Sequence, residues 1–244
     1  MSVERLGVKP NPSHPAKFSW AVLDVLQRLI DSERRRLKRP PLVLDPFCGV
    51  GRIHSLEHCD TVGVEIEADW AACHHRTEVG DATALRFQAG AFDAVMCSPV
   101  YPGRMTDHHD NRDSHKACAG KGCRACNGTG ISPRKNYRVA LGRMPSEGSA
   151  AVMGWGAPYR ILHRTAAAEM VRVVAPGGMI AINMSDSIGG GKVIPAVDWW
   201  RWTMEDVGLK ITRVLPVQTP RMLAGANREL RAEHEVVIVA RKPR

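Results

Sequence analysis

The spacing of apolar residues changes from helical to strand-like within the first part of the chain. Across 15–37 the apolar side chains recur at helical spacing, which predicts a helix that ends before the Pro-Pro pair at 40–41. Shorter apolar runs follow at 42–44, 61–66 and 91–97. Short runs of this kind, separated by turn residues and longer segments, predict the repeated βαβ order of an α/β domain.

The last third of the chain continues this alternation. Residues 159–174 have helical spacing and lead, after a Pro-Gly-Gly turn, into a buried-strand pattern at 179–184. A second helix is predicted at 196–207, where the three neighbouring tryptophans indicate core packing. The β-rich runs at 210–217 and 235–240 predict an antiparallel hairpin at the edge of the sheet.

Residues 102–155 interrupt the alternation of helices and strands. They have almost no hydrophobic periodicity, and the segment is too long for an ordinary connection inside a compact domain. We therefore interpret 1–244 as a single domain that carries 102–155 as an inserted functional region.

The composition excludes several classes of protein. With 44% apolar and 24% charged residues the chain can build a core, unlike a disordered protein. No apolar run approaches the roughly 18 to 20 residues of a membrane span, and the first residues do not resemble a signal peptide, so we expect a cytoplasmic protein. Four cysteines lie in apolar contexts that predict reduced, buried thiols: Cys48, Cys59, Cys73 and Cys97.

The positive charge is concentrated in one part of the chain. Residues 100–172 hold 12 basic and 5 acidic residues, so they supply +7 of the formal net charge of +9. All three tyrosines, Tyr101, Tyr137 and Tyr159, lie in the same stretch. Basic residues interleaved with aromatic ones favour a surface that contacts phosphates and stacks on bases, although a solvated basic loop has the same composition.

Three acidic positions and a glycine turn indicate a nucleoside-like ligand. The predicted strand at 42–44 runs into Asp45-Pro-Phe-Cys-Gly49-Val-Gly51, and glycines at such a turn let the backbone approach a ligand closely. Glu65 ends the next strand, where a carboxylate can accept both ribose hydroxyls, and Asp81 could accept from an adenine amino group. The third glycine of a dinucleotide motif is missing, which favours an adenosine ligand without pyrophosphate, such as S-adenosylmethionine.

A second motif, Ser98-Pro99-Val100-Tyr101, follows the predicted strand at 91–97. In an open α/β sheet this end of a strand lies at the ligand crevice. The Ser98 hydroxyl and neighbouring carbonyls could accept hydrogen bonds from an amine, and Tyr101 offers a ring on which a base can stack. Asn183, Ser185 and Asp186 end a later strand and could shape the same pocket or cap the next turn.

These motifs resemble those of amino-directed DNA methyltransferases. The segment from Asp45 to Gly51 is similar to the family's D-P-F-x-G-x-G cofactor motif, and Ser98-Pro99-Val100-Tyr101 to its catalytic S/D/N-P-P-Y/F motif, except that Val100 replaces the second proline. The segment from His14 to Phe18 resembles the one that closes over the methionine end of the cofactor. The resemblance implies a Rossmann-like methyltransferase fold, with a mostly parallel seven-stranded sheet and an antiparallel C-terminal hairpin.

The resemblance also implies roles for individual residues. Catalysis is assigned to Ser98, Pro99 and Tyr101. Binding of S-adenosyl-L-methionine is assigned to His14, Lys17, Phe18, Asp45, Pro46, Phe47, Gly49, Gly51, Glu65, Ile66, Asp81, Ala82 and Ser98. Serine at the first catalytic position favours cytosine N4 over adenine N6 as the methylated amine, and the target base would be flipped out of the DNA duplex.

A third pattern lies inside the inserted region. His115, Cys118, Cys123 and Cys126 have spacings that suit a structural zinc ion, with His108 or His109 as alternatives to His115 for the fourth ligand. The segment Cys123-Arg-Ala-Cys126-Asn-Gly-Thr-Gly resembles half a repeat of the zinc domain in J-domain chaperones. Three free thiols in a loop are the alternative, with redox chemistry less favoured. A zinc-stabilised region would present its basic residues to DNA phosphates.

The sequence therefore predicts an S-adenosylmethionine-dependent DNA methyltransferase, with DNA as its partner. Two alternatives stay open. The first is methylation of RNA or of a protein glutamine, because related motifs also occur in enzymes that methylate planar amine groups in those substrates. The second is a DNA-binding module that has kept the fold but lost catalysis, which is suggested by Val100 in the catalytic motif.

Overall fold

The computed structural model describes residues 18–102, 137–219 and 228–244. The helices are α1 (Trp20–Leu37), α2 (Ala68–Ala71), α3 (Tyr137–Leu141), α4 (Ala157–Val173) and α5 (Ala196–Asp206), with 3₁₀ turns η2 (Arg52–Ser55), η4 (Ala150–Val152) and η5 (Arg228–Leu230). The strands are β1 (Leu42–Asp45), β2 (Asp60–Glu65), β3 (Thr77–Val79), β4 (Phe92–Cys97), β5 (Val174–Met184), β6 (Ser187–Gly189), β7 (Lys192–Ile194), β8 (Lys210–Val217) and β9 (Glu235–Arg241).

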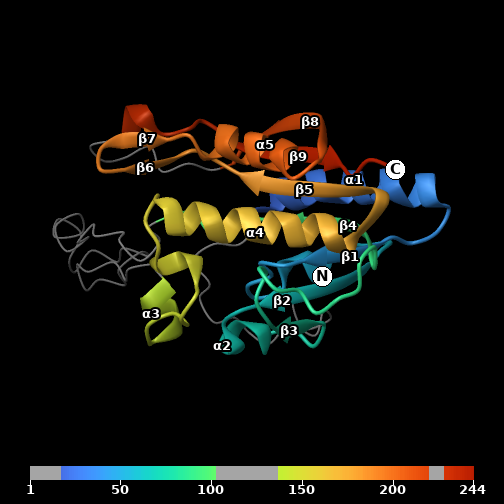
Figure 1. The fold of residues 1–244 in the computed structure, drawn as a ribbon, viewed down its shortest axis with the longest axis horizontal. Coiled ribbons are helices and arrows are strands. Elements are labelled where there is room, and N and C mark those ends of the chain that lie inside the picture. Colours follow the sequence, from blue (N-terminus) through green and yellow to red (C-terminus); the bar gives the residue numbers. More distant parts are fainter. Residues whose placement is uncertain (1–17, 103–136, 220–227) are drawn as a thin grey trace, which may run out of the picture.

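Seven of these strands form one sheet in the order β3-β2-β1-β4-β5-β9-β8 (Figure 1). The strands from β3 to β5 in this order are parallel to one another, whereas β9 is antiparallel to both β5 and β8. This confirms the expected mostly parallel sheet with an antiparallel C-terminal pair. The small β6–β7 hairpin is separate from the main sheet and was not expected from the sequence.

Helices cover both faces of the sheet because successive residues of the central strands point to opposite sides. Leu44, Val95 and Ile180 pack in one core cluster with α4 and α5. Their neighbours Val43 and Ala94 pack in a second cluster with α1 on the other face. Near-continuous apolar runs in the sequence are thus explained by burial on both faces.

Helix α1 has clear signals at both ends. The Ser19 hydroxyl accepts a hydrogen bond from the Val22 backbone N–H at 3.2 Å, and Lys38 ends the helix in the left-handed conformation with φ 58°. Near its end the buried Glu33 pairs with Arg36 and with Arg241 of β9. The helix is therefore tied to the C-terminal strand as well as packed on the sheet.

Two features of the fold differ from the sequence-based expectation: the start of β5 and the presence of α3. Strand β5 begins directly after α4 at Val174, because the Pro-Gly-Gly segment continues the strand instead of separating helix from strand. Gly177 donates its backbone N–H to the Lys242 carbonyl, and a register shift on β4 between Phe92 and Ala94 accommodates the segment. A five-residue helix, α3, lies within the range that was expected to lack regular structure.

The cysteines and tryptophans largely follow expectation. Cys48, Cys73 and Cys97 are buried free thiols, and Cys59 is a half-buried one. Trp200 is buried in the core, whereas Trp202 is 56% exposed and does not belong to it. Within the described residues, no helix is both long and apolar enough to cross a membrane.

Gly63→Ala is expected to destabilise the protein by about 1–3 kcal/mol, because overpacking forces a close-packed core to move. A Cβ on Gly63 of β2 would overlap the Cys48 sulfur and lie 2.7 Å from the Thr77 hydroxyl. Urea unfolding measures the change. Gly154→Ala is the matched control, since no described atom lies within 4 Å of a Cβ built there. Equal unfolding midpoints for the two variants would contradict this packing argument.

Candidate active site

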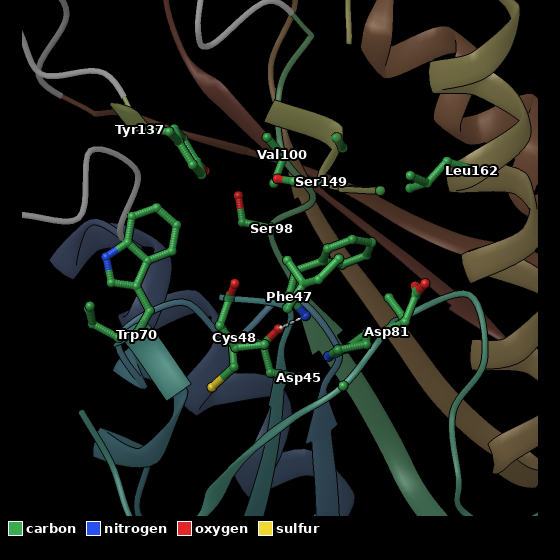
Figure 2. Close-up of a pocket in the computed structure, with 18 of the residues that line it drawn as sticks. Asp45, Phe47, Cys48, Trp70, Asp81, Ser98, Val100, Tyr137, Ser149 and Leu162 are labelled. Atoms are coloured by element: carbon green, nitrogen blue, oxygen red, sulfur yellow. Dashed lines mark hydrogen bonds between the residues drawn. The ribbon is translucent and has the colours of Figure 1, made fainter. Parts of the chain in front are cut away.

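A pocket opens at the carboxyl ends of β1, β2 and β4 (Figure 2). Strand order reverses between β1 and β4, and in open α/β sheets ligands bind at such a point. The lining residues come from the two sequence motifs, the loops after β2 and β3, and the segment before α4. They are Phe18, Asp45, Pro46, Phe47, Cys48, Val50, Arg52, Glu65, Ile66, Trp70, Gly80, Asp81, Ala82, Ser98, Val100, Tyr137, Gly148, Ser149, Ala150 and Leu162.

The glycine turn after β1 brings backbone to the edge of this pocket. Gly49 and Gly51 have φ values of 56° and 82°, in the left-handed region that favours glycine. A Cβ on Gly51 would lie 2.8 Å from the Cβ of His74, so the position also lacks space for a side chain. The turn is closed by a hydrogen bond from the Gly51 N–H to the Cys48 carbonyl at 3.0 Å.

Glu65 links the end of β2 to that turn. One carboxylate oxygen accepts the Gly49 N–H at 2.7 Å, and the other accepts the Glu67 N–H at 2.9 Å. Each carboxylate oxygen has a further lone pair, so Glu65 can still accept hydrogen bonds from two hydroxyls of a ligand. Burial is the largest influence on this group and raises its pKa to about 7, despite the hydrogen bonds that favour the charged form.

Asp45 lies behind Glu65 and is almost completely buried. Its carboxylate accepts the Phe47 N–H at 3.0 Å, which shapes the first residues of the turn. Burial raises the pKa of Asp45 to about 8, and the negative charge of Glu65 adds to the shift. The floor of the pocket thus holds two buried carboxyl groups, and the charge of Glu65 disfavours the ionisation of Asp45.

Asp81 lies at the exposed side of the pocket after β3. Its Oδ1 accepts from both the backbone N–H and the hydroxyl of Thr83, each at 2.8 Å. These bonds fix the carboxylate and leave Oδ2 available to a ligand amino group. Gly80 and the buried Ala82 complete this wall.

The Ser-Pro-Val-Tyr segment presents Ser98 to the pocket. Figure 2 shows Ser98 near its centre, with Trp70 and Tyr137 on one side and Phe47 on the other. The buried Asn183 donates from its Nδ2 to the Ser98 hydroxyl oxygen at 3.5 Å and to Glu235 at 2.8 Å. Asn183 thus contacts Ser98 from behind without being one of the described lining residues, and its role in shaping the pocket stays a prediction.

The backbone after Ser98 is held in place by α4. The Tyr159 hydroxyl donates to the Val100 carbonyl at 2.7 Å, and Pro99 is buried. Val100 lines the pocket at the position where the similar family usually has proline. Tyr101 lies half-buried against the larger core cluster and is not among the described lining residues, so its stacking role stays a prediction.

Among the described lining residues, the aromatic side chains of Trp70 and Tyr137 were not assigned to the site from the sequence, unlike Phe18 and Phe47. Trp70 and Tyr137 meet edge to face with ring centres 5.0 Å apart, and Phe47 stacks on the buried His163 at 5.6 Å. His163 donates its Nδ1–H to the Tyr159 carbonyl at 2.9 Å, and burial lowers its pKa to about 4, so the ring is neutral. The concentration of tyrosines in the basic segment was the one available signal for Tyr137.

Six predicted site residues lie outside the described part of the chain. They are His14 and Lys17 before α1, and the zinc candidates His115, Cys118, Cys123 and Cys126. Their assignments stay predictions. In 18–102, 137–219 and 228–244 no cluster of three or more His, Cys, Asp or Glu side chains is arranged to hold a metal ion.

Comparison with known proteins supports the fold. No protein-family model and no curated protein matches the chain. A solved structure from Bacillus halodurans C-125, assigned as a methyltransferase, superposes with a TM-score of 0.51 at 12% identity, covering 91% of this chain and 99% of that one. The chain has the Rossmann-like methyltransferase fold.

Two further solved structures are each 16% identical to the chain. One is a 1,6-didemethyltoxoflavin-N1-methyltransferase from Burkholderia thailandensis with bound S-adenosylhomocysteine, which has a TM-score of 0.46 and coverages of 92% and 79%. The other is a TehB-like S-adenosylmethionine-dependent methyltransferase from Corynebacterium glutamicum, with a TM-score of 0.45 and coverages of 95% and 100%. At these identities the likeness extends to the fold alone.

Proposed function

We propose that the chain is an S-adenosylmethionine-dependent DNA methyltransferase that modifies an exocyclic amine, cytosine N4 in preference to adenine N6. One observation carries the proposal: Glu65 and Ser98, which the sequence assigned to cofactor and target amine, line the same pocket at the strand-order reversal. Glu65 retains acceptor capacity for ribose hydroxyls, and Asp81 retains an oxygen for the adenine amino group.

The main task of the protein in this reaction is to align the target amine with the methyl group of the cofactor. The bound cofactor supplies an activated methyl group on a sulfonium, and the amine is a weak nucleophile because its lone pair is delocalised into the ring. Ser98 and a neighbouring carbonyl can accept the two amine hydrogens, which favours a more tetrahedral nitrogen. The Asn183 hydrogen bond orients the serine, and Trp70, Phe47 and Tyr137 provide apolar walls that exclude water.

DNA is proposed as the substrate on two grounds. The motif order resembles that of amino-directed DNA methyltransferases, and residues 100–172 carry a net charge of +7 next to the catalytic motif. Neutralisation of phosphates by Lys and Arg is the main source of non-specific affinity for DNA. A base must leave the duplex to reach a pocket of this kind.

Activity can be measured with isotope-labelled cofactor and DNA of mixed sequence, digested to nucleosides and analysed by mass spectrometry. We expect N4-methylcytosine. N6-methyladenine would retain the proposed reaction and change the target base. Methylation of RNA or of a protein amide in parallel incubations, with unmodified DNA, would show that DNA is the wrong substrate.

Ser98→Ala is expected to lower the methylation rate about tenfold, because one hydrogen-bond acceptor for the amine is lost. Ser98 is also one of the assigned cofactor residues, but cofactor affinity should fall by no more than a factor of about two or three, since Glu65, Asp81 and the glycine turn are unchanged. Single-turnover methylation and calorimetric binding of S-adenosylhomocysteine separate the two effects. Ser32→Ala on α1, which does not line the pocket, is the matched control. An unchanged rate in Ser98→Ala would remove the assigned role of this residue.

A further inference from the structure

One wall of the pocket is formed by the segment that joins α3 to η4. We call residues 142–149 the strap. Its Gly148 and Ser149 line the pocket directly, and a Cβ on Gly148 would lie 3.8 Å from the Ile66 side chain. The strap therefore lies against the loop after β2, the same loop that presents Glu65 and Ile66 to the pocket. Figure 1 shows α3 at the end of the molecule where α4 begins.

Glu67 on that loop holds the strap by two hydrogen bonds and an ion pair. Its Oε1 accepts the Ser146 backbone N–H at 2.7 Å, and its Oε2 accepts the Ser146 hydroxyl at 2.9 Å. Arg143 lies 3.0 Å from Oε2 and also pairs with Asp69 at 2.7 Å. Two residues of the strap thus converge on one carboxylate.

Because Glu67 is buried, losing these contacts would be energetically costly. The residue has no exposed surface, and a buried carboxylate that loses its partners is strongly unfavourable. Glu67 is also the N-cap residue of α2, yet its side chain makes no capping hydrogen bond to that helix. The described side-chain contacts of Glu67 are directed to the strap rather than to the start of its own helix.

The same residue is joined to the ligand-binding acid. The Glu67 backbone N–H donates to Glu65 at 2.9 Å, so the group that holds the strap and the group assigned to the ribose hydroxyls share one short loop. Displacement of the strap would leave the buried Glu67 carboxylate without the hydrogen bonds and the ion pair that offset its burial. It would also disturb the loop that positions Glu65. A ligand below the strap would stay bound as long as these contacts persist.

We propose that Glu67 is a positioning residue that fastens the strap over the cofactor pocket, so that release of the adenosyl ligand requires breaking its contacts with Ser146 and Arg143. The inference rests on the proposed function only in taking an adenosyl cofactor as the ligand. It requires no knowledge of the methylated substrate, and binding of S-adenosylhomocysteine alone can test it.

The experiment measures the dissociation rate of labelled S-adenosylhomocysteine from the full chain after a chase with unlabelled ligand. Glu67→Gln is expected to release the ligand about tenfold faster, because hydrogen bonds to an ionised acceptor are roughly twice as strong as neutral ones. Ser146→Ala and Arg143→Ala should each accelerate release about threefold. The matched control is Arg164→Ala, which removes an exposed ion pair with Asp206 between α4 and α5 and should leave the rate unchanged.

The salt dependence of the release rate distinguishes a role of Glu67 in holding the strap from a general contribution to stability. Arg143 is partly exposed, so added salt should accelerate release from the wild type, whereas Glu67→Gln should have lost most of this dependence. A merely structural contribution would lower the unfolding temperature without changing the salt response of release.

The outcomes are distinct. Faster release in Glu67→Gln, Ser146→Ala and Arg143→Ala, with unchanged release in Arg164→Ala, supports the proposal. Wild-type protein that binds the ligand, with equal release rates in all variants, overturns it and leaves the proposed function intact. Failure of the wild type to bind S-adenosylhomocysteine overturns both. If Glu67→Gln does not fold, Ser146→Ala and Arg143→Ala decide the matter, because equal rates in these two again overturn the proposal.

Discussion

Glu65→Gln is expected to weaken binding of S-adenosylhomocysteine about a hundredfold. Glutamine keeps the size of the side chain but has one oxygen, whereas Glu65 accepts the N–H groups of Gly49 and Glu67 on separate oxygens. The amide NH₂ would face one of these donors, and a buried backbone N–H left without its acceptor costs about 1–3 kcal/mol. Acceptors for the ligand hydroxyls are lost at the same time. Isothermal titration calorimetry measures the affinity.

The matched control is Glu78→Gln on the neighbouring strand β3, where the carboxylate pairs with the exposed Arg86 and does not line the pocket. It should bind the ligand as the wild type does. Folding of both variants can be checked by circular dichroism. An affinity of Glu65→Gln within twofold of the wild type would show that this carboxylate does not contact the ligand.

Asp45 and Glu65 could be predicted from the sequence because each ends a strand with a strong apolar pattern. The runs before Asp45 and Glu65 identify parallel strands, and parallel strands bring their carboxyl ends to one edge of a sheet. Ser98 follows β4 for the same reason. Local pattern and sheet topology therefore suffice to bring the two motifs together.

The walls of the pocket could not be predicted in this way. Trp70 lies on a four-residue helix, too short for periodicity to reveal, and Tyr137 on one of five residues. Their meeting depends on tertiary contacts between α2 and α3, which are far apart in the sequence. The contacts of Glu67 with the strap are likewise long-range and side-chain specific. No spacing rule connects residues 67 and 146.

The buried carboxyl groups also reveal a conflict between stability and binding. Asp45 and Glu65 lie close together, and burial raises both pKa values, to about 8 and about 7. A ligand with hydroxyl donors favours the ionised Glu65, whereas the folded protein without ligand favours neutral carboxyls. Sites that bind ligands often retain groups that lower the stability of the free protein.

Asp45→Asn is therefore expected to stabilise the ligand-free protein at pH 8 by up to about 5 kcal/mol, since each unit of the pKa rise corresponds to about 1.4 kcal/mol. The folded-state pKa of Asp45 is raised from an ordinary 3.8 to about 8. Its protonation thus stabilises the fold fully below about pH 4, and this stabilisation is lost as the pH rises toward 8. Asparagine carries no charge at any pH, and its carbonyl can still accept the Phe47 N–H.

The difference in unfolding free energy between Asp45→Asn and wild type should accordingly be small at pH 4 and grow steadily up to pH 8. Urea unfolding at a series of pH values measures it, and taking the difference removes the contributions of other titrating groups. Asp198→Asn on α5, where the carboxylate is exposed beside Arg201, is the matched control and should show a flat difference. A difference for Asp45→Asn that is also flat would mean that folding does not raise the pKa of Asp45, and that burial at the pocket floor does not disfavour its charge.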